Sequence, residues 1–408
     1  MNSIGEVKGR RILLLQGPMG YFFKRLDKAF RAQGAQTFRI GFNVGDRFFS
    51  YGDNYTPYRG HPGEEWEAFI ERYLRDNAID KIFLFGDCRH YQSIAIGVAQ
   101  KLGVEVFVFE EGYVRPHYIT MERWGVNDYS HVSRDPDFYR ALPEIKVPKP
   151  RHARASKTEM VVSATIYYAL SNLLEFCYPH YRHHRDFSAI KEAFHGVRGL
   201  VRKGIYPYWD RKTLERLTGE LSGRFYFVPL QTHNDFQILQ HSPYQSIEKF
   251  IIHVVESFAE HAPEDTYLFF KHHPVDRGRK NYRNVILEQA GYAGVKDRVL
   301  VGHDMKLPEI FKHARATVTV NSTVGLTSIQ YGVPTITLGR AIYDIPGLTN
   351  SGMELHDFWT RYKQPDAELY RKFHAYIVDN TQLNGSFYGL MPEELDPLCV
   401  NRRCFKKN

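Results

Sequence analysis

Short, continuous hydrophobic runs that alternate with amphipathic stretches fill the first ~130 residues of the chain. This alternation is typical of a parallel sheet covered by helices on both faces. We expect strands at 11–16, 37–42, 81–86 and 104–110. We expect helices at 21–33, 64–77 and 90–103, with a loop containing Gly45 and Asp46 before the second helix.

The second half of the chain repeats the same alternation. We expect strands at 224–230, 266–274, 299–302, 316–321 and 334–339, and helices at 245–261, 307–314 and 322–332. A length of 408 residues suits two cores rather than one. The pattern predicts an α/β, GT-B-like fold in which two Rossmann-like domains face a central cleft. We place the domains at 1–150 and 221–408, the latter with a C-terminal tail, joined by a helical connecting segment at 151–220.

The net charge of +8 is concentrated in the connecting segment. Between Arg151 and Lys212 there are eleven Lys and Arg against five Asp and Glu, interleaved with aromatic residues. Such a segment suits an anionic partner, namely a lipid surface, an acidic saccharide or a nucleic acid. A solvated linker of amphipathic helices explains the pattern equally well. Because no nucleic-acid recognition motif accompanies the charge, we expect no nucleic-acid partner.

Cysteine spacing and the lengths of the apolar runs bear on the cellular compartment. The four cysteines lie far apart or at the tail, which fits a reducing cytoplasm better than a disulfide framework. The apolar run near the N-terminus is too short for a signal peptide. No stretch reaches the roughly 18–20 apolar residues of a membrane span. We therefore expect a cytoplasmic protein that at most rests on a membrane.

Two polar clusters in the second half suit a phosphate group. Ser322 and Thr323 begin a predicted helix, where they can cap it or bind an anion at its free N–H groups. A strand ends in KHHP, whose Lys271 and His273 can donate to a phosphate, although structural histidines are the alternative. There is no Walker A motif, no G-x-G-x-x-G after the first strand and no metal-ligand spacing. We therefore expect no metal cofactor.

Two other predicted strands are followed by carboxylate side chains at their C-terminal ends. VFVFEEGY ends in Glu110 and Glu111, and side-chain alternation directs one to an opening and the other to the packing side. Either could serve as a general base, or both could pair with arginines such as Arg115. In FVPLQTHNDF, Gln231 can bind a sugar, and Asp235 can act as a nucleophile or cap a helix.

These clusters, taken in order, resemble the KpsS/LipB family of bacterial capsule-polysaccharide proteins. The resemblance is strongest in EEGY-x-RP and VPLQ-x-x-x-D, and weakest over 151–220 and in the tail. It also includes LLLQGPMGYFFKRL, FNVGDRFF, FGDCRHYQSIAIGVAQKLG, KHHP and NSTVGLTSIQYGVPTITLG. Members of this family are similar to retaining β-Kdo glycosyltransferases that use CMP-Kdo. The implied activity is transfer of Kdo to lysophosphatidylglycerol, which starts the poly-Kdo linker of a capsule.

The resemblance also implies roles for individual residues. By double displacement, Asp235 would attack the anomeric carbon as CMP leaves, and Glu111 would then activate the acceptor hydroxyl. Glu110 remains an alternative to Glu111 and is otherwise a substrate-binding residue. Residues expected to bind the donor are Gln231, Lys271, His273, Ser322 and Thr323. Candidates to bind the carboxylate of Kdo are Arg115 and Arg277.

The expected partners are CMP-Kdo, the lysophospholipid, an anionic membrane surface and other capsule-assembly proteins. The protein would be peripheral on the inner face of the cytoplasmic membrane, with segment 151–220 facing the lipid. Two alternatives remain open, another CMP-sugar transferase and a non-catalytic capsule-assembly or export adaptor.

Overall fold

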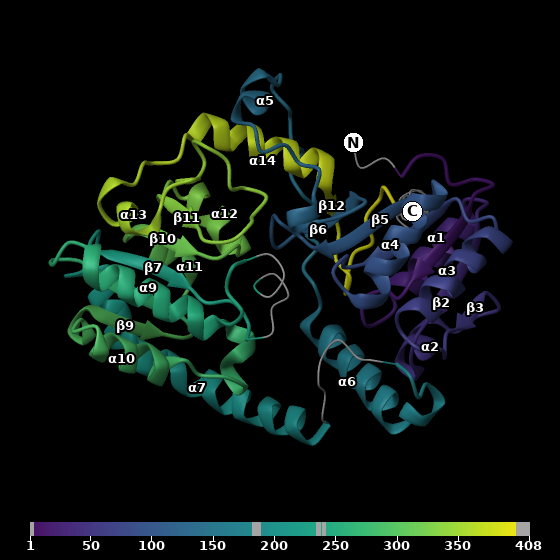
Figure 1. Ribbon diagram of the computed structural model, residues 1–408, viewed down its shortest axis with the longest axis horizontal. Helices are drawn as coiled ribbons and strands as arrows, with labels where there is room; N and C mark the ends of the chain where they lie inside the picture. Colours follow the sequence, from purple (N-terminus) through teal and green to yellow (C-terminus); the bar gives the residue numbers. More distant parts are fainter. Residues whose placement is uncertain (1–3, 182–188, 234–237, 239–241, 397–408) are drawn as a thin grey trace, which may run out of the picture. The chain divides into compact units, whose positions relative to one another are not determined.

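The chain forms two compact α/β units, each built on its own sheet (Figure 1). The computed structural model describes residues 4–181, 189–233, 238 and 242–396. The first unit comprises Met1–His131, Lys146–Ala189 and Ala375–Asn408. The second comprises Val132–Ile145 and Ile190–His374.

The first sheet has the order β12-β6-β5-β4-β1-β2-β3. Neighbours from β5 to β3 pair in parallel, whereas β6 is antiparallel to both β5 and β12. The strands are β1 (Arg11–Leu15), β2 (Gln36–Gly41), β3 (Tyr55–Pro57), β4 (Lys81–Phe85), β5 (Glu105–Glu111), β6 (Tyr118–Arg123) and β12 (Gln382–Asn384). Helices of this unit are α1 (Phe22–Ala32), α2 (Val44–Ser50), α3 (Glu64–Asp76), α4 (His90–Leu102) and α6 (Lys157–Leu173), with 3-10 turns η1 (Asn127–Tyr129) and η2 (Glu175–Cys177).

The second sheet is parallel throughout, in the order β11-β10-β7-β8-β9. Its strands are β7 (Phe225–Pro229), β8 (Tyr267–Lys271), β9 (Val299–Gly302), β10 (Ala314–Thr319) and β11 (Thr335–Thr337). Its helices are α5 (Pro136–Ala141), α7 (Ala189–Thr218), α9 (Ile247–His261), α10 (Arg283–Tyr292), α11 (Leu307–Phe311), α12 (Thr323–Gln330) and α13 (Leu355–Arg361). The 3-10 turns are η3 (Pro274–Gly278) and η4 (Lys296–Arg298), and α14 (Ala367–Thr381) begins in this unit and ends in the first.

The hydrophobic runs form the sheet cores, as the sequence predicted. Each unit has its own buried clusters, in which strand residues pack against the apolar faces of the helices. In α9, for example, Phe250, Val254 and Phe258 are buried against the second sheet at helical spacing. The prediction of an α/β fold with two Rossmann-like units is confirmed.

The structure differs from the sequence-based assignment in several places. The segment with Gly45 and Asp46 is not a loop but helix α2, because the Asn43 side chain caps it by accepting the N–H of Asp46. The end of the chain does not stay with the second half, because β12 pairs with β6 in the first sheet. The expected connecting segment 151–220 is likewise divided, with α6 in the first unit and most of α7 in the second.

No helix in the described ranges has both the length and the apolarity needed to cross a membrane.

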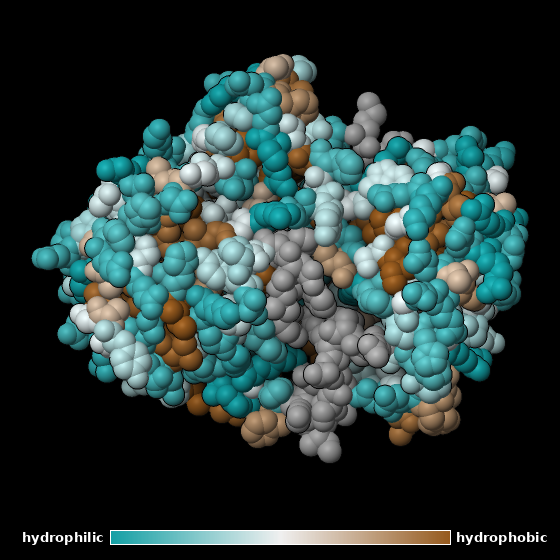
Figure 2. Space-filling model, in the orientation of Figure 1, coloured by the Kyte–Doolittle hydropathy of each residue, from teal (hydrophilic) through white to brown (hydrophobic). Residues whose placement is uncertain are grey.

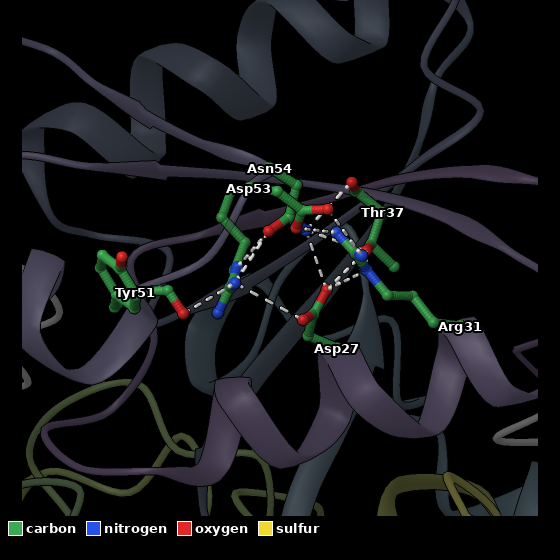
Figure 3. A network of polar contacts seen from close by, with 7 residues as sticks. Asp27, Arg31, Thr37, Tyr51, Asp53 and Asn54 are labelled. Carbon is green, nitrogen blue, oxygen red and sulfur yellow. Dashed lines mark hydrogen bonds and ion pairs between the residues drawn. The ribbon is translucent and has the colours of Figure 1, made fainter.

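A buried polar network holds α1 against β2 in the first unit (Figure 3). Asp27 accepts hydrogen bonds from Thr37 and from Asn54 Nδ2, the latter at 3.0 Å. Its carboxylate also lies 3.3 Å from Nε of Arg31 and 3.6 Å from Nη2 of Arg39. Only 4% of the Arg39 side chain is exposed, and burial lowers the pKa of its guanidinium. The network therefore depends on Asp27 for negative charge beside a buried cation.

We predict that Asp27→Ala lowers the free energy of unfolding by about 3–5 kcal/mol, because it leaves the Arg39 guanidinium buried without its counter-ion. The matched control is Asp53→Ala. Asp53 also pairs with Arg31, at 3.0 Å, but 81% of its side chain is exposed, so the loss should be at most about 1 kcal/mol. Urea unfolding of the two variants measures the difference, and equal effects would contradict the assigned role of Asp27.

Candidate functional site

The glutamate pair at the end of β5 occupies two different environments. Glu110 is half-buried, and its Oε1 accepts the backbone N–H of Glu111 at 3.0 Å. Burial raises the pKa of Glu110 to about 7, the backbone hydrogen bond and Arg89 oppose this, and the charges of Glu111 and Asp87 add to it. Glu111 is exposed. The alternation expected from the sequence is thus present, and Glu110 is the group that can exchange a proton near neutral pH.

A second carboxyl group, which sequence reasoning assigned to a loop, lies at the same edge of the first sheet. Asp46 is buried and accepts hydrogen bonds from Tyr167 Oη at 3.0 Å and Gln16 Nε2 at 3.0 Å. Burial raises its pKa to about 6, although those bonds, the N–H of Phe42 and the charge of Arg89 oppose the rise. Gln16 directly follows β1 with a φ of 37°, a strained conformation for a non-glycine residue. The positive charge of Arg89 lowers the pKa of both acids at this edge, Asp46 and Glu110.

In the second unit, residues that follow β7 and β10 contact each other. Gln231 is buried, its Nε2 lies 3.1 Å from Oδ1 of Asn321, and its Oε1 accepts the N–H of Asn321 at 3.4 Å. Ser322 caps α12 by accepting the N–H of Val324 at 3.2 Å, and Thr323 is the first residue of that helix. The capping interpretation of Ser322 is therefore confirmed. Gln231 and the start of α12 share the carboxyl edge of the sheet, where α/β proteins bind ligands.

The KHHP segment at the end of β8 is more deeply buried than the sequence suggested. Lys271 is buried and its pKa is lowered by that burial, with Asp304 and Asp210 opposing the change. His272 is a structural histidine, because its ring accepts the N–H of Tyr282 at 2.8 Å, and burial lowers its pKa to about 4. His273 is half-exposed and accepts the N–H of Val275 at 3.2 Å. Of the two histidines, only His273 is placed to meet a ligand.

A histidine–aspartate pair that we did not predict anchors the segment before Asp235. Buried Asp276 accepts the backbone N–H of His233 at 2.9 Å, and its other oxygen lies 2.7 Å from Nδ1 of the same residue. Asp276 belongs to η3, the turn that begins directly after His273. The pair therefore ties the end of β7 to the turn that follows β8. Asp235 itself lies outside the described residues.

The two arginines expected to bind the carboxylate of Kdo are both engaged by the protein. Arg115 is exposed, and its Nε donates to the carbonyl oxygen of Gly112 at 3.2 Å. Arg277 forms a bidentate pair with Asp304, with Nε to Oδ2 at 2.6 Å. A ligand carboxylate would have to displace Asp304 from Arg277, which makes Arg277 the weaker candidate.

The sequence carried partial signals for the residues that were missed. Asp46 lies in FNVGD, and His233 lies between Gln231 and Asp235, but only the fold shows that both are fixed by hydrogen bonds.

No group of three or more potential metal ligands was found in the described ranges. Each unit thus presents polar side chains at the carboxyl edge of its sheet. Acids with raised pKa values lie in the first unit, and cationic or N–H donors lie in the second.

Comparison with known proteins identifies relatives of this chain. Residues 80–388 match the family described as capsule polysaccharide biosynthesis protein. The chain is 40% identical to the capsule polysaccharide export protein KpsS of Escherichia coli, over 94% of this chain and 98% of that protein. It is 38% identical to the capsule polysaccharide modification protein LipB of Neisseria meningitidis serogroup A, over 92% of this chain and 91% of that protein. Among solved structures, it is similar to the KpsC β-Kdo 2,7 transferase of Thermosulfurimonas dismutans, with a TM-score of 0.44 and 13% identity. The match covers 97% of this chain and 100% of that chain.

Proposed function

Because the chain belongs to the capsule polysaccharide biosynthesis protein family, we propose that it is a glycosyltransferase that moves β-Kdo from CMP-Kdo to lysophosphatidylglycerol. The product would be the first unit of the poly-Kdo linker on which a capsular polysaccharide is built. The observation that carries the transferase proposal is Glu110, a carboxyl group at the end of a parallel strand with a pKa of about 7. Such a group can take a proton from an acceptor hydroxyl at neutral pH.

The proposed reaction retains configuration through two displacements. Asp235 attacks the anomeric carbon of Kdo, the bond from that carbon to the phosphate oxygen breaks, and CMP leaves with the electron pair. The acceptor hydroxyl then attacks the same carbon, gives its proton to a carboxylate of the glutamate pair, and releases Asp235. The family resemblance implied Glu111 as this base, with Glu110 as the alternative. The environment of Glu110 supports Glu110 instead, and both enter the tests below.

The second unit supplies groups suited to the donor. His273 and the N–H groups at the start of α12 are proposed to bind the phosphate, with Lys271 contributing positive charge and Gln231 contacting the sugar. Because CMP carries a single phosphate, these groups provide enough counter-charge for transfer without a metal ion. We also propose that the protein works at the inner face of the cytoplasmic membrane, where it meets the lysophospholipid and other capsule-assembly proteins.

Mass spectrometry of the lipid after incubation with CMP-Kdo and lysophosphatidylglycerol tests the proposal. We expect the acceptor mass to rise by one Kdo residue. Parallel incubations with CMP-sialic acid, as a second CMP-sugar, test the donor. Turnover of the second donor but not of CMP-Kdo would replace our assignment with another CMP-sugar transferase. No turnover of any donor, together with capsule export that survives loss of Asp235 in cells, would identify a non-catalytic adaptor.

A further inference from the structure

The exposed face of α7 is hydrophobic, the reverse of what a surface helix of a globular protein presents. Its exposed large apolar side chains have between 37% and 79% of their surface accessible. They are Phe194, Val197, Leu200, Val201, Ile205, Tyr208 and Trp209, which we call the apolar stripe. Their spacing of three and four residues places most of them along one side of the helix.

The opposite side of α7 is fixed to the second unit, so the helix cannot rotate the stripe inward. Asp210 is buried and accepts the N–H groups of His303 and Asp304 at 2.9 and 2.7 Å. Tyr206 is buried and stacks on the ring of His303, with the ring centroids 3.9 Å apart. Arg202 donates to the carbonyl oxygen of Arg277 at 2.9 Å. The stripe is therefore a permanent feature of the surface of this helix.

Positive charge accompanies the stripe. From Phe194 to Lys212 the basic residues are Arg198, Arg202, Lys203, Arg211 and Lys212, and the single acidic residue is the buried Asp210. In Figure 2, hydrophobic residues lie at the lower left, where Figure 1 draws α7. Arg211 pairs with Glu215 of the same helix at 2.9 Å. The excess of cations over acids along this part of α7, beside an apolar face, complements an anionic lipid surface.

We propose that the apolar stripe of α7 inserts into the interface of an anionic phospholipid membrane and holds the enzyme there. The helix lies in the plane of the membrane, since it lacks the apolar length to cross it. Tyr208 and Trp209 lie at headgroup depth, the level that amphipathic aromatic rings prefer. This docking surface brings a lipid acceptor to the protein. The docking proposal rests on the proposed function only in its choice of phosphatidylglycerol as the anionic lipid.

Sedimentation with vesicles tests the proposal without any sugar donor, so docking and transfer can fail independently. The full-length protein is mixed with vesicles of phosphatidylcholine alone or of phosphatidylcholine with phosphatidylglycerol. We expect strong binding to the mixed vesicles only. Addition of these vesicles should also shift the emission of exposed Trp209 to the blue, and Trp209→Phe should remove that shift.

Two sets of substitutions separate the apolar from the electrostatic contribution. Val197→Glu with Val201→Glu removes little packing, because both residues are more than half exposed, and should weaken binding at least ~10-fold. Arg198→Gln with Lys212→Gln should weaken binding to the mixed vesicles by ~10-fold or more, because each cation near an anionic surface contributes roughly 5-fold. The control is Tyr292→Glu, which places one negative charge at an exposed aromatic position of α10.

The outcomes are distinct. Weaker binding in both stripe variants, with unchanged binding in Tyr292→Glu and unchanged circular dichroism in all three, supports the proposal. Undiminished binding by the glutamate variant overturns it. A concentration-dependent dimer in light scattering, which the glutamate variant dissociates while wild-type protein leaves the vesicles unbound, would also overturn it and assign the stripe to contacts between copies.

Discussion

Replacement of Asp235 by alanine is expected to lower Kdo transfer by ~10⁴-fold or more while CMP still binds. Loss of a residue that forms covalent bonds to the substrate typically lowers kcat by this order. The phosphate-binding groups proposed for CMP belong to other elements of the second unit and stay in place. Asp235 also lies two residues after His233 in the sequence, and Asp276 and Asn321 hold His233 and Gln231 by hydrogen bonds.

The measurements are transfer kinetics, CMP calorimetry and peptide mass spectrometry. In wild-type protein incubated with donor alone, the peptide containing Asp235 should carry the mass of one Kdo residue. Asn234→Ala is the matched control, since it changes the neighbouring side chain without removing the carboxylate. An adduct on another residue, or full activity of Asp235→Ala, would refute double displacement through Asp235.

Glu110→Gln is expected to lower kcat by about 10²–10⁴-fold, the usual contribution of a general base. As a base, Glu110 must be ionised. With a pKa of about 7, wild-type activity should therefore rise with pH through neutrality, and this rise should be absent from the residual activity of the variant. Glu111→Gln, a control that differs by one position on β5, should keep the pH dependence. If Glu111→Gln loses activity and Glu110→Gln does not, the base is Glu111, as the family resemblance implied.

Glu110→Gln is expected to raise the stability of the folded protein, although it lowers activity. The folded protein raises the pKa of Glu110 from an unfolded value of 4.5 to about 7, so the folded state binds the proton more tightly. The free energy of unfolding therefore decreases as pH rises from about 4.5 to 7, and the loss persists above that range. At pH 8 we expect Glu110→Gln to be more stable than wild type by ~1–2 kcal/mol, a value that allows for partial solvent exposure. Urea unfolding at pH 5 and pH 8 measures this gain.

The sequence predicted those features that depend on local pattern. The hydrophobic runs located the strands of both sheets apart from β3, β6 and β12. The edge strands β3 and β12 are only three residues long, and β6 is antiparallel to both of its neighbours. Polar residues after strands pointed to the carboxyl edges of the two sheets, because the carboxyl ends of parallel strands share one edge. The roles assigned to these residues stay predictions. Helix α2 was missed, since its start depends on the single capping side chain of Asn43.

Features that depend on contacts distant in sequence could not be predicted. Asp276 lies 43 residues after His233, and Tyr167 lies 121 residues after Asp46, so neither hydrogen bond has a local signature. Arg277 was assigned to the substrate because its partner Asp304 was not known to be adjacent. The orientation of α7 was equally hidden. Its composition indicated an anionic partner, but only the burial of Asp210 and Tyr206 shows which face is exposed.

The pairing of β12 with β6 has a consequence for biosynthesis. The second unit ends at His374, whereas the first sheet acquires its edge strand only when residues 382–384 have been added. The second unit is therefore the first of the two whose whole chain has emerged from the ribosome, although most of it is synthesised after the first 131 residues. The first sheet is complete only after β12 has been synthesised, so a nascent chain that stops short of β12 leaves β6 as an open edge for a chaperone or a neighbouring chain to occupy.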